Sequence, residues 1–174
     1  MADMVTAYVG LGSNLHNPVR QLKRALVQIQ RLPGTTISAI SPFYRNPALL
    51  PEGVAEPQPA FVNAVAELRT ALPPRSLLRM LLHIEHKQGR RRSYRWAPRT
   101  LDLDLLLYGQ QCLQTSELIL PHPELWRRAF VLYPLRDIAP ALRVPRRGCV
   151  QNLLARVKHQ ARIPLADVNV VGRA

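Results

Sequence analysis

The sequence is poor in several features that would assign it to a particular class of protein. Only two of its 174 residues are cysteines, Cys112 and Cys149, and they lie far apart. Such a pair makes neither a zinc pattern nor a disulfide framework, so a reducing cytoplasm is the simplest compartment. No run of about 18 apolar residues occurs, which argues against a membrane-spanning helix. The first residues lack a basic segment followed by an apolar one, so we expect no secretory signal.

Acidic residues are also scarce. The 11 Asp and Glu stand against 24 Lys and Arg, which gives a formal net charge of +13, and only three of the cations are lysine. Guanidinium groups bind phosphate oxygens in pairs, so nucleic acid, nucleotides and acidic membranes are all open as partners. Hydrophobic residues make up 47% of the chain, which excludes a disordered basic tail and allows one domain with a real core.

The distribution of charge narrows the class of partner. Six of the 24 cations fall between Lys87 and Arg99, and three acids, Glu85, Asp102 and Asp104, lie in or beside the same stretch. A plain nucleic-acid surface would tend to exclude acids. A cationic loop beside two carboxylates is better suited to phosphate that is bound through a metal ion.

Hydrophobic periodicity predicts alternating strands and helices. Strands are expected at residues 5–11, 35–44, 61–69 and 100–108, with helices beginning at Asn17-Pro18 and at Pro73-Pro74. This order is βαββαβ, the split βαβ of ferredoxin-like folds. We therefore predict an α+β fold with an antiparallel sheet, helices on its faces and extra C-terminal elements.

The remaining segments are expected to be loops and additions to this core. The proline-rich residues 45–59 predict a long loop, and the glycines at 10 and 12 predict a tight turn between the first strand and the first helix. A short strand is expected near 118–120 and helices near 125–135 and 150–157. We expect one domain over residues 1–174, with a core of about 4–140 and a C-terminal extension of about 146–174.

Asp102 and Asp104 are the clearest candidate site residues. They alternate with Leu101, Leu103 and Leu105 on a predicted strand, so both carboxylates face the same way with Cα atoms roughly 6.6 Å apart. That spacing lets them share one or two hard cations. The alternative is an amphipathic strand that shows acids to water, although aspartate is depleted in strands.

Other candidate residues give weaker signals. The arginine-rich loop 89–99 leads into the aspartate strand and contains Trp96, which could stack on a flat ring; a solvated basic loop is the alternative. His122 lies between two prolines near Arg127 and Arg128, where a structural role is as plausible as phosphate contact. Asn63 faces the same way as Phe61, so this pair could bind a heterocycle or simply be exposed.

These segments together resemble the 6-hydroxymethyl-7,8-dihydropterin pyrophosphokinases of folate biosynthesis, from about Ala7 to about Pro140. The most specific stretch is residues 95–106, RWAPRTLDLDLL. The supporting pieces agree in order and approximate spacing; they are GSNL at 12–15, FYR at 43–45, FVNA at 61–64, IE at 84–85, QGR at 88–90, PHP at 121–123 and RAFVL at 128–132.

The resemblance implies an ATP-dependent diphosphotransferase with two Mg²⁺ ions, in which the pterin hydroxymethyl oxygen attacks the β-phosphorus and AMP leaves. It implies that Asp102 and Asp104 hold the metal ions and act in catalysis together with Arg90 and Arg99, which grip the phosphates. The ATP site it implies is made of Glu85, Arg92, Arg99, Leu105, His122 and Arg128. The pterin pocket it implies is made of Asn46, Pro47, Leu49, Phe61, Asn63, Trp96 and Phe130, with the two Phe rings sandwiching the pterin and Asn63 reading its polar edge.

Departures from the family pattern are few. Asn46 stands where Thr is frequent, Phe61 stands where Tyr is frequent, and the run Leu125-Trp126-Arg127 differs from the usual polar one. The tail after about Arg146 resembles nothing in the family.

Two other classes remain as alternatives. A nucleic-acid-binding module would explain the positive charge, but the aromatic pattern of RNA-binding sheets is absent. An inactive relative would lack a ligand, yet every matched catalytic position is filled. We therefore expect ATP and the pterin as partners, and neither nucleic acid nor a membrane. The protein itself is expected to be a monomer in the cytoplasm.

Overall fold

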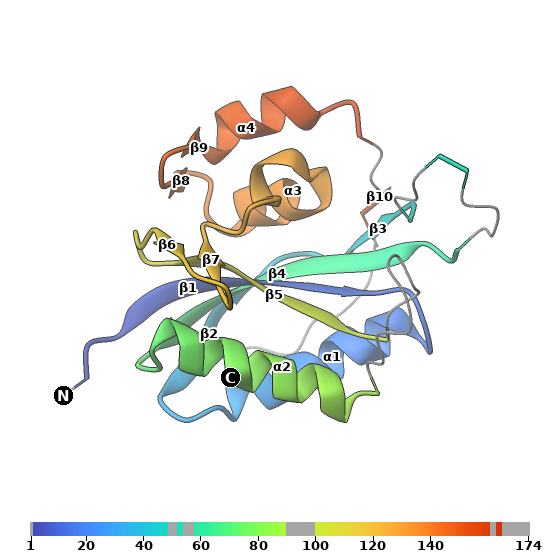
Figure 1. Ribbon diagram of the computed structural model, residues 1–174. Helices are drawn as coiled ribbons and strands as arrows, with labels where there is room; N and C mark the ends of the chain where they lie inside the picture. The colour runs from blue at the N-terminus through green and yellow to red at the C-terminus, as the bar shows by residue number, and fades with distance from the viewer. Residues whose placement is uncertain (1, 49–51, 54–57, 90–99, 161–162, 165–174) are drawn as a thin grey trace.

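The computed structural model describes residues 2–48, 52–53, 58–89, 100–160 and 163–164 (Figure 1). Strands and helices alternate along the core as the sequence predicts. The core elements are β1 (Val5–Ser13), α1 (Pro18–Gln30), β2 (Thr35–Ile40), β3 (Tyr44–Asn46), β4 (Phe61–Thr70), α2 (Pro74–Lys87) and β5 (Asp102–Tyr108). The elements that follow are β6 (Leu113–Gln114), β7 (Ile119–Leu120), the 3-10 helix η1 (Leu125–Arg127), α3 (Ala129–Ile138), β8 (Arg143–Val144), β9 (Gly148–Cys149), α4 (Val150–Val157) and β10 (Ile163–Pro164).

The core strands form one antiparallel sheet. Its order among the described strands is β10-β3-β4-β1-β5, and β2 also pairs with β4. The four long strands therefore lie in the order β2-β4-β1-β5, which places the first and third strands of the βαββαβ core at the centre. The predicted α+β, ferredoxin-like fold with an antiparallel sheet is confirmed.

Helices cover both faces of the sheet (Figure 1). α1 and α2 lie on one face over the alternating apolar residues of the strands, including Val9, Leu11, Leu103 and Leu105. α3 and α4 lie on the other face, where Val65 and other apolar side chains form a second buried cluster. No helix in the described part of the chain is both long and apolar enough to cross a bilayer.

The first helix begins as its sequence predicts. The Asn17 side chain accepts a hydrogen bond from the backbone N–H of Arg20 at 3.3 Å, and Pro18 occupies the first turn, where no N–H is needed. Asn17 and Pro18 therefore define where α1 begins after β1, and the chain returns to the sheet at β2.

The second predicted strand is divided in two. β2 ends at Ile40 and β3 begins at Tyr44, so β3 also occupies the start of the predicted 45–59 loop. Between them, Ser41 uses its hydroxyl rather than a backbone carbonyl to accept from the N–H of Val65 at 2.9 Å. Pro42 then has no N–H to continue the ladder. The break lets β3 follow β4 in a separate piece and carries Asn46 to the end of the sheet.

The predicted turn at the glycines is wrong. Gly10 and Gly12 lie inside β1, paired with β4 on one side and β5 on the other. The predicted C-terminal helices are found as α3 and α4, with η1 before them. The sequence did not predict β10, which pairs with β3.

Candidate functional site

The two aspartates lie on the face of the sheet that α3 and α4 partly cover. In the β1–β5 register Asp104 is opposite Gly10 and Asp102 is opposite Gly12, so both carboxylates project beside glycines without side chains. Both aspartates are half-buried. Glycine at these two positions keeps the backbone of β1 bare beside the carboxylates, where the side chains of Asn63 and Leu106 approach it.

A row of directly paired residues joins the aspartates to the centre of the sheet. Asp102 is opposite Gly12 on β1, Gly12 is opposite Asn63 on β4, and Asn63 is opposite Tyr44 on β3. Directly paired residues in antiparallel strands point to the same face. The carboxylate of Asp102 and the amide of Asn63 are therefore separated only by the bare backbone of Gly12.

Position 12 requires a glycine because the side chain of Asn63 lies close to it. A Cβ at Gly12 would lie 2.8 Å from Oδ1 of Asn63 and 3.9 Å from the ring of Phe61. At Gly10 an added Cβ would meet only the Leu106 side chain, at the ordinary distance of 3.5 Å. Gly12 is thus a site residue that sequence reasoning missed, because a glycine two residues from another is typical of a turn.

This geometry predicts different results for two matched substitutions. Gly12→Ala would force the Asn63 amide to rotate, so we expect the KM for the pterin to rise about tenfold, the size of one lost hydrogen bond. Gly10→Ala on the same strand and face is the control, and its pterin KM should stay within about twofold of wild type. Steady-state kinetics of both variants measures this, and equal effects would contradict the role given to Gly12.

Asn46 has a buried amide with an unusual environment. It is 4% exposed and lies opposite Phe61 in the β3–β4 register, so the two side chains share a face. Neither Nδ2 nor Oδ1 has a hydrogen-bond partner among the residues that the structure describes. Buried polar groups are nearly always paired, so an unpaired amide beside an aromatic ring indicates a place for a ligand.

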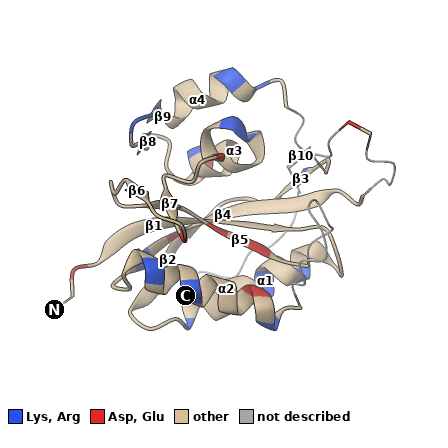
Figure 2. Cartoon of the chain, viewed as in Figure 1, with Lys and Arg blue, Asp and Glu red and all other residues tan. Residues whose placement is uncertain are grey.

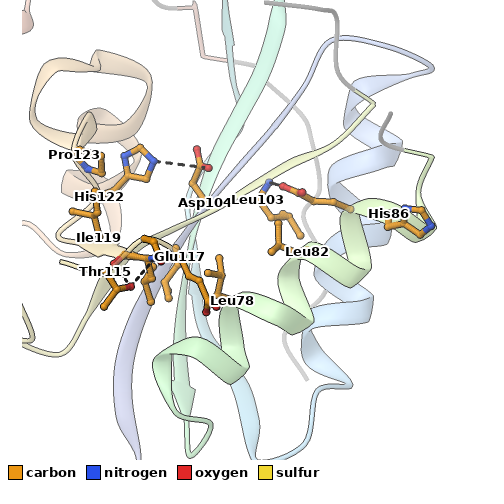
Figure 3. A pocket seen from close by; sticks show the side chains of 14 residues that line it. Leu78, Leu82, His86, Leu103, Asp104, Thr115, Glu117, Ile119, His122 and Pro123 are labelled. Carbon is orange, nitrogen blue, oxygen red and sulfur yellow. Dashed lines mark hydrogen bonds and ion pairs between the residues drawn. The ribbon is translucent and has the colours of Figure 1, made fainter. Parts of the chain in front are cut away.

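Glu85 binds the backbone of β5, the strand that carries the two aspartates. Its carboxylate is 3% exposed at the end of α2, and Oε1 accepts the backbone N–H of Leu103 at 2.7 Å (Figure 3). Leu103 is the residue between the two aspartates. Glu85 therefore fixes the backbone from which both carboxylates project, and its place in the ATP site stays a prediction.

His122 follows β7 and lies close to Asp104 on β5. Its Nδ1 accepts the backbone N–H of Glu124 at 3.1 Å, and its Nε2 lies 3.9 Å from Oδ1 of Asp104 (Figure 3). Burial lowers the pKa of the imidazole, with a further lowering from the charge of Arg128, while Asp102 and Glu124 act in the other direction. A neutral ring with an occupied Nδ1 carries its proton on Nε2, which can donate toward Asp104 or a bound phosphate.

These residues border a cavity of about 560 Å³. It lies between α2, the edge strand β5 and the β6–β7 hairpin (Figure 3). Its lining combines apolar side chains from α2 and the hairpin with four of the predicted ATP-site or metal residues, which are Glu85, Asp104, Leu105 and His122. A hollow lined by both apolar and polar side chains, with Asp104 and His122 in its wall, suits a ligand such as a nucleotide that has a flat ring and charged groups.

The start of α3 contributes two more predicted residues. The guanidinium carbon of Arg128 lies 5.6 Å from the centroid of the Phe130 ring. The backbone of Arg128 is extended and directly precedes α3. Phe130 is half-buried in the first turn of α3. The neighbouring Trp126, which departs from the family pattern, is held between Arg127 and Arg147 at 4.3 and 4.5 Å from its ring centroid, so its local role is packing.

Five of the predicted site residues lie outside the described residues; they are Leu49, Arg90, Arg92, Trp96 and Arg99. Pro47 is described and is exposed directly after Asn46. Within the described ranges no cluster of three or more His, Cys, Asp or Glu could hold a metal ion. Among the described residues, Asp102 and Asp104 remain the predicted metal ligands.

Positive charge in the described part of the chain gathers mainly away from this site. Figure 2 shows Lys and Arg along α1, α2 and α4, whereas β5 carries acidic residues. A hollow of about 570 Å³ on α1 is lined by Arg20, Lys23, Arg24, Arg31 and Lys87, together with Val27 and Gln28. It belongs to the helices on the other face of the sheet from Asp102 and Asp104.

The fold and this face define a small α+β enzyme with a nucleotide-sized cavity beside two carboxylates. Residues 8–140 match the family described as 7,8-dihydro-6-hydroxymethylpterin-pyrophosphokinase (HPPK), which is more than half of the chain. The chain belongs to this family. The predicted family and the predicted function, an ATP-dependent pterin diphosphotransferase of folate biosynthesis, are confirmed.

Curated relatives cover most of the chain. It is 51% identical over 148 residues to a 2-amino-4-hydroxy-6-hydroxymethyldihydropteridine pyrophosphokinase of Pseudomonas aeruginosa, covering 85% of this chain and 89% of the relative. It is 45% identical over 151 residues to the protein of that name from Haemophilus influenzae, covering 87% of this chain and 92% of the relative.

Solved structures support the fold. The wild-type Plasmodium falciparum HPPK-DHPS with pterin and p-hydroxybenzoate aligns with a TM-score of 0.70 at 16% identity over 98% of this chain. The same wild-type protein with SDX-DHP aligns with a TM-score of 0.67 at 15% identity over 88% of this chain. This chain spans only 46% and 44% of those two longer chains.

Proposed function

We propose that the transfer of the diphosphate group from ATP to the hydroxymethyl oxygen of 6-hydroxymethyl-7,8-dihydropterin takes place at the face that carries Asp102 and Asp104. The observation that supports this assignment most strongly is the row from Asp102 through Gly12 to Asn63. The nucleotide cavity lies on one side of the carboxylates, and the amides of Asn63 and Asn46 lie on the other. Two ligands placed there would meet at the aspartates.

ATP would occupy the cavity between α2 and the β6–β7 hairpin. Its apolar lining suits the adenine, and its phosphates would extend past His122 toward the aspartates. Arg90, Arg92, Arg99 and Arg128 would bind the phosphate oxygens, with the guanidinium fork making paired contacts. Glu85 would act by holding the Leu103 backbone.

The pterin would lie beyond Gly12, between the rings of Phe61 and Phe130, with Trp96 covering it and Pro47 and Leu49 at its border. Asn63 would read its polar edge. The buried amide of Asn46 faces the same side as Phe61 and has no partner among the described residues, so we assign it a side-chain contact to the pterin.

Two magnesium ions suit the donors on this face. Asp102 and Asp104 offer hard carboxylate oxygens on one face of β5, opposite Gly12 and Gly10 of β1. Magnesium commonly uses one or two protein carboxylates and takes its other ligands from water and substrate phosphates. When bound, the ions would neutralise the phosphate charge and stabilise the charge that develops in transfer.

The reaction then requires mainly positioning. The hydroxymethyl oxygen forms a bond to the β-phosphorus, the bond from that phosphorus to the α,β-bridging oxygen breaks, and AMP leaves with that oxygen while the hydroxyl proton passes to solvent or to a carboxylate. The chain's own groups hold the oxygen in line and surround the phosphates with positive charge, which are the main sources of rate in phosphoryl transfer.

The unit that performs this reaction is the whole chain. We propose one domain over residues 1–174, with a core of about 4–140 and the extension of about 146–174, acting as a monomer in the cytoplasm. Release of AMP that depends on both the pterin and magnesium tests the proposed function. ATP hydrolysis that is indifferent to the pterin would contradict it.

Asn46 offers a test that separates binding from folding. Asn46→Leu removes a buried amide that lacks a described partner, so we expect the free energy of unfolding to rise by about 1 kcal/mol or more. The same change should raise the KM for the pterin about tenfold, because the ligand loses its contact. Denaturant melts and kinetics measure the two effects.

The control is Asn152→Leu, the same substitution at an exposed position of α4. It should leave the pterin KM unchanged. If Asn46→Leu instead destabilised the fold and bound the pterin normally, the amide would be a structural group and its assignment to the pterin would be wrong.

A further inference from the structure

The C-terminal extension contacts the proposed site through one side chain, Gln160. Its amide bridges two backbone groups that flank Arg128: Nε2 donates to the carbonyl of Arg127 at 2.9 Å, and Oε1 accepts the N–H of Ala129 at 2.9 Å. Gln160 follows α4 and is half-buried. Both peptide groups next to the Arg128 Cα are thereby held by a single side chain 31 residues or more away in sequence.

This bridge replaces a cap that α3 does not have. Arg128 occupies the N-cap position with φ −114° and ψ 110°, and its own side chain makes no capping hydrogen bond. The first N–H groups of a helix have no partner within the helix, and Gln160 satisfies the one at Ala129. Fixing the peptides before and after Arg128 fixes its φ and ψ, and these set the direction in which the arginine leaves the chain.

The same bridge fixes the start of the helix that carries Phe130. Phe130 is in the first turn of α3, directly after Ala129, and the Arg128 guanidinium lies 5.6 Å from its ring centroid. A shift of the Ala129 backbone would therefore move a predicted ATP ligand and a predicted wall of the pterin pocket together.

The extension is itself well anchored on both sides of Gln160. Before it, α4 packs against α3 through Val150, Leu153, Leu154 and Val157, which are all buried. After it, the β10 backbone pairs with β3, with Ile163 opposite Arg45 and Pro164 opposite Tyr44. Tyr44 in turn donates a hydrogen bond to the Asp137 carboxylate on α3. Gln160 therefore belongs to a braced segment that joins β3 and α3, the two elements that carry Asn46 and Phe130.

We propose that Gln160 is a positioning residue that sets Arg128 for the ATP phosphates and Phe130 for the pterin ring, an inference that rests on the proposed function. Gln160 lies beyond residues 8–140, the part of the chain that matches the family. The extension thus completes the substrate site although the family pattern ends before it.

Gln160→Met tests this role, because methionine keeps the length of the side chain and loses both hydrogen bonds. Each neutral hydrogen bond changes an equilibrium by about two- to tenfold, so we expect the KM values for ATP and for the pterin each to rise about three- to tenfold. The kcat should stay within about twofold, since binding that is equal in the ground and transition states affects KM alone. Gln160→Ala should behave alike and serves if Gln160→Met folds poorly.

The matched control is Gln151→Ala, an exposed glutamine on α4. It should leave both KM values unchanged. A purely structural role of Gln160 would instead lower Tm and the amount of active enzyme, with both KM values at their wild-type level, and that result would overturn the proposal.

A double-mutant cycle shows whether Gln160 acts through Arg128. In an Arg128→Ala background, Gln160→Met should add nothing to the KM for ATP, because the side chain it positions is gone. Full additivity of the two effects would refute the mechanism. Calorimetry of the same variants with a non-hydrolysable ATP analogue measures ATP binding without turnover. This measurement still tests the positioning role if the wild type shows no pterin-dependent turnover. Such a lack of turnover would count against the proposed function and not against the positioning role.

Discussion

Replacing Asp102 or Asp104 by alanine is expected to reduce turnover by about 10²-fold or more while the protein stays folded. Each change removes one of two carboxylates that face the same side of β5, opposite Gly12 and Gly10 of β1. Loss of a group that stabilises transition-state charge costs about 3 kcal/mol, which corresponds to that change in rate. Asp102→Asn and Asp104→Asn should be nearly as poor, because they keep the shape and lose the charge that holds a cation.

Three controls make this result specific. Asp3→Ala removes an exposed aspartate near the N-terminus and should leave turnover unchanged. Tm should move by less than about 5 °C in the site variants, because both side chains are only half-buried. Magnesium titrations should show a weaker metal dependence for the site variants than for wild type. Near-normal turnover in both alanine variants would exclude the assignment of these aspartates as metal ligands.

Arg90 and Arg99 are expected to show the second large effect. If both arginines bind the ATP phosphates, alanine at either position should lower kcat/KM by about 10²-fold or more, as for the loss of a charged transition-state contact. Lysine should restore little, because a point charge does not replace the paired contacts of the guanidinium fork. Steady-state kinetics with ATP as the varied substrate measures both effects.

The controls for these arginines also test the nucleic-acid alternative. Arg24 is exposed in the cationic hollow on α1, and Arg143 is exposed in β8. Alanine at either should leave turnover unchanged. A diffuse nucleic-acid surface predicts something different: each arginine would be one phosphate contact among many, its loss would lower the salt slope of binding by about one unit, and lysine would nearly restore it. Small, equal effects at all four positions would favour that surface.

The strand that carries the aspartates could be predicted from sequence because its rule is local. Alternation with period two places Asp102 and Asp104 on one face whatever the rest of the fold does, and β5 confirms this placement. The cap at Asn17 is predictable for the same reason, since the side chain contacts a backbone group three residues on. The βαββαβ order then follows from the sequence of such local patterns.

The parts that sequence reasoning missed depend on distant neighbours. Two close glycines are typical of a turn, and only the approach of Asn63 from another strand shows why Gly12 has no side chain. The unpaired amide of Asn46 becomes visible only once its burial is known. The bridge from Gln160 joins residues 31 or more apart through a tail that lacks the family pattern. No periodicity in the chain encodes these three features.

The contact that Glu85 makes with β5 depends on a distant neighbour in the same way. The family pattern places it in the ATP site, and the cavity does include it in its lining. Its carboxylate, however, is turned to the backbone N–H of Leu103, which a sequence pattern does not reveal. A residue of this kind affects catalysis by holding the strand on which the two aspartates stand.

The central claim is that the two substrates meet at Asp102 and Asp104 and that a diphosphate group moves between them. Incubating the protein with magnesium, the pterin and ATP labelled on the β-phosphorus tests it directly. We predict that the label appears in the pterin product in a one-to-one ratio with AMP, and that Asp102→Ala slows the transfer by about 10²-fold or more. Label that remained in ADP, or AMP that formed equally well without the pterin, would contradict the account.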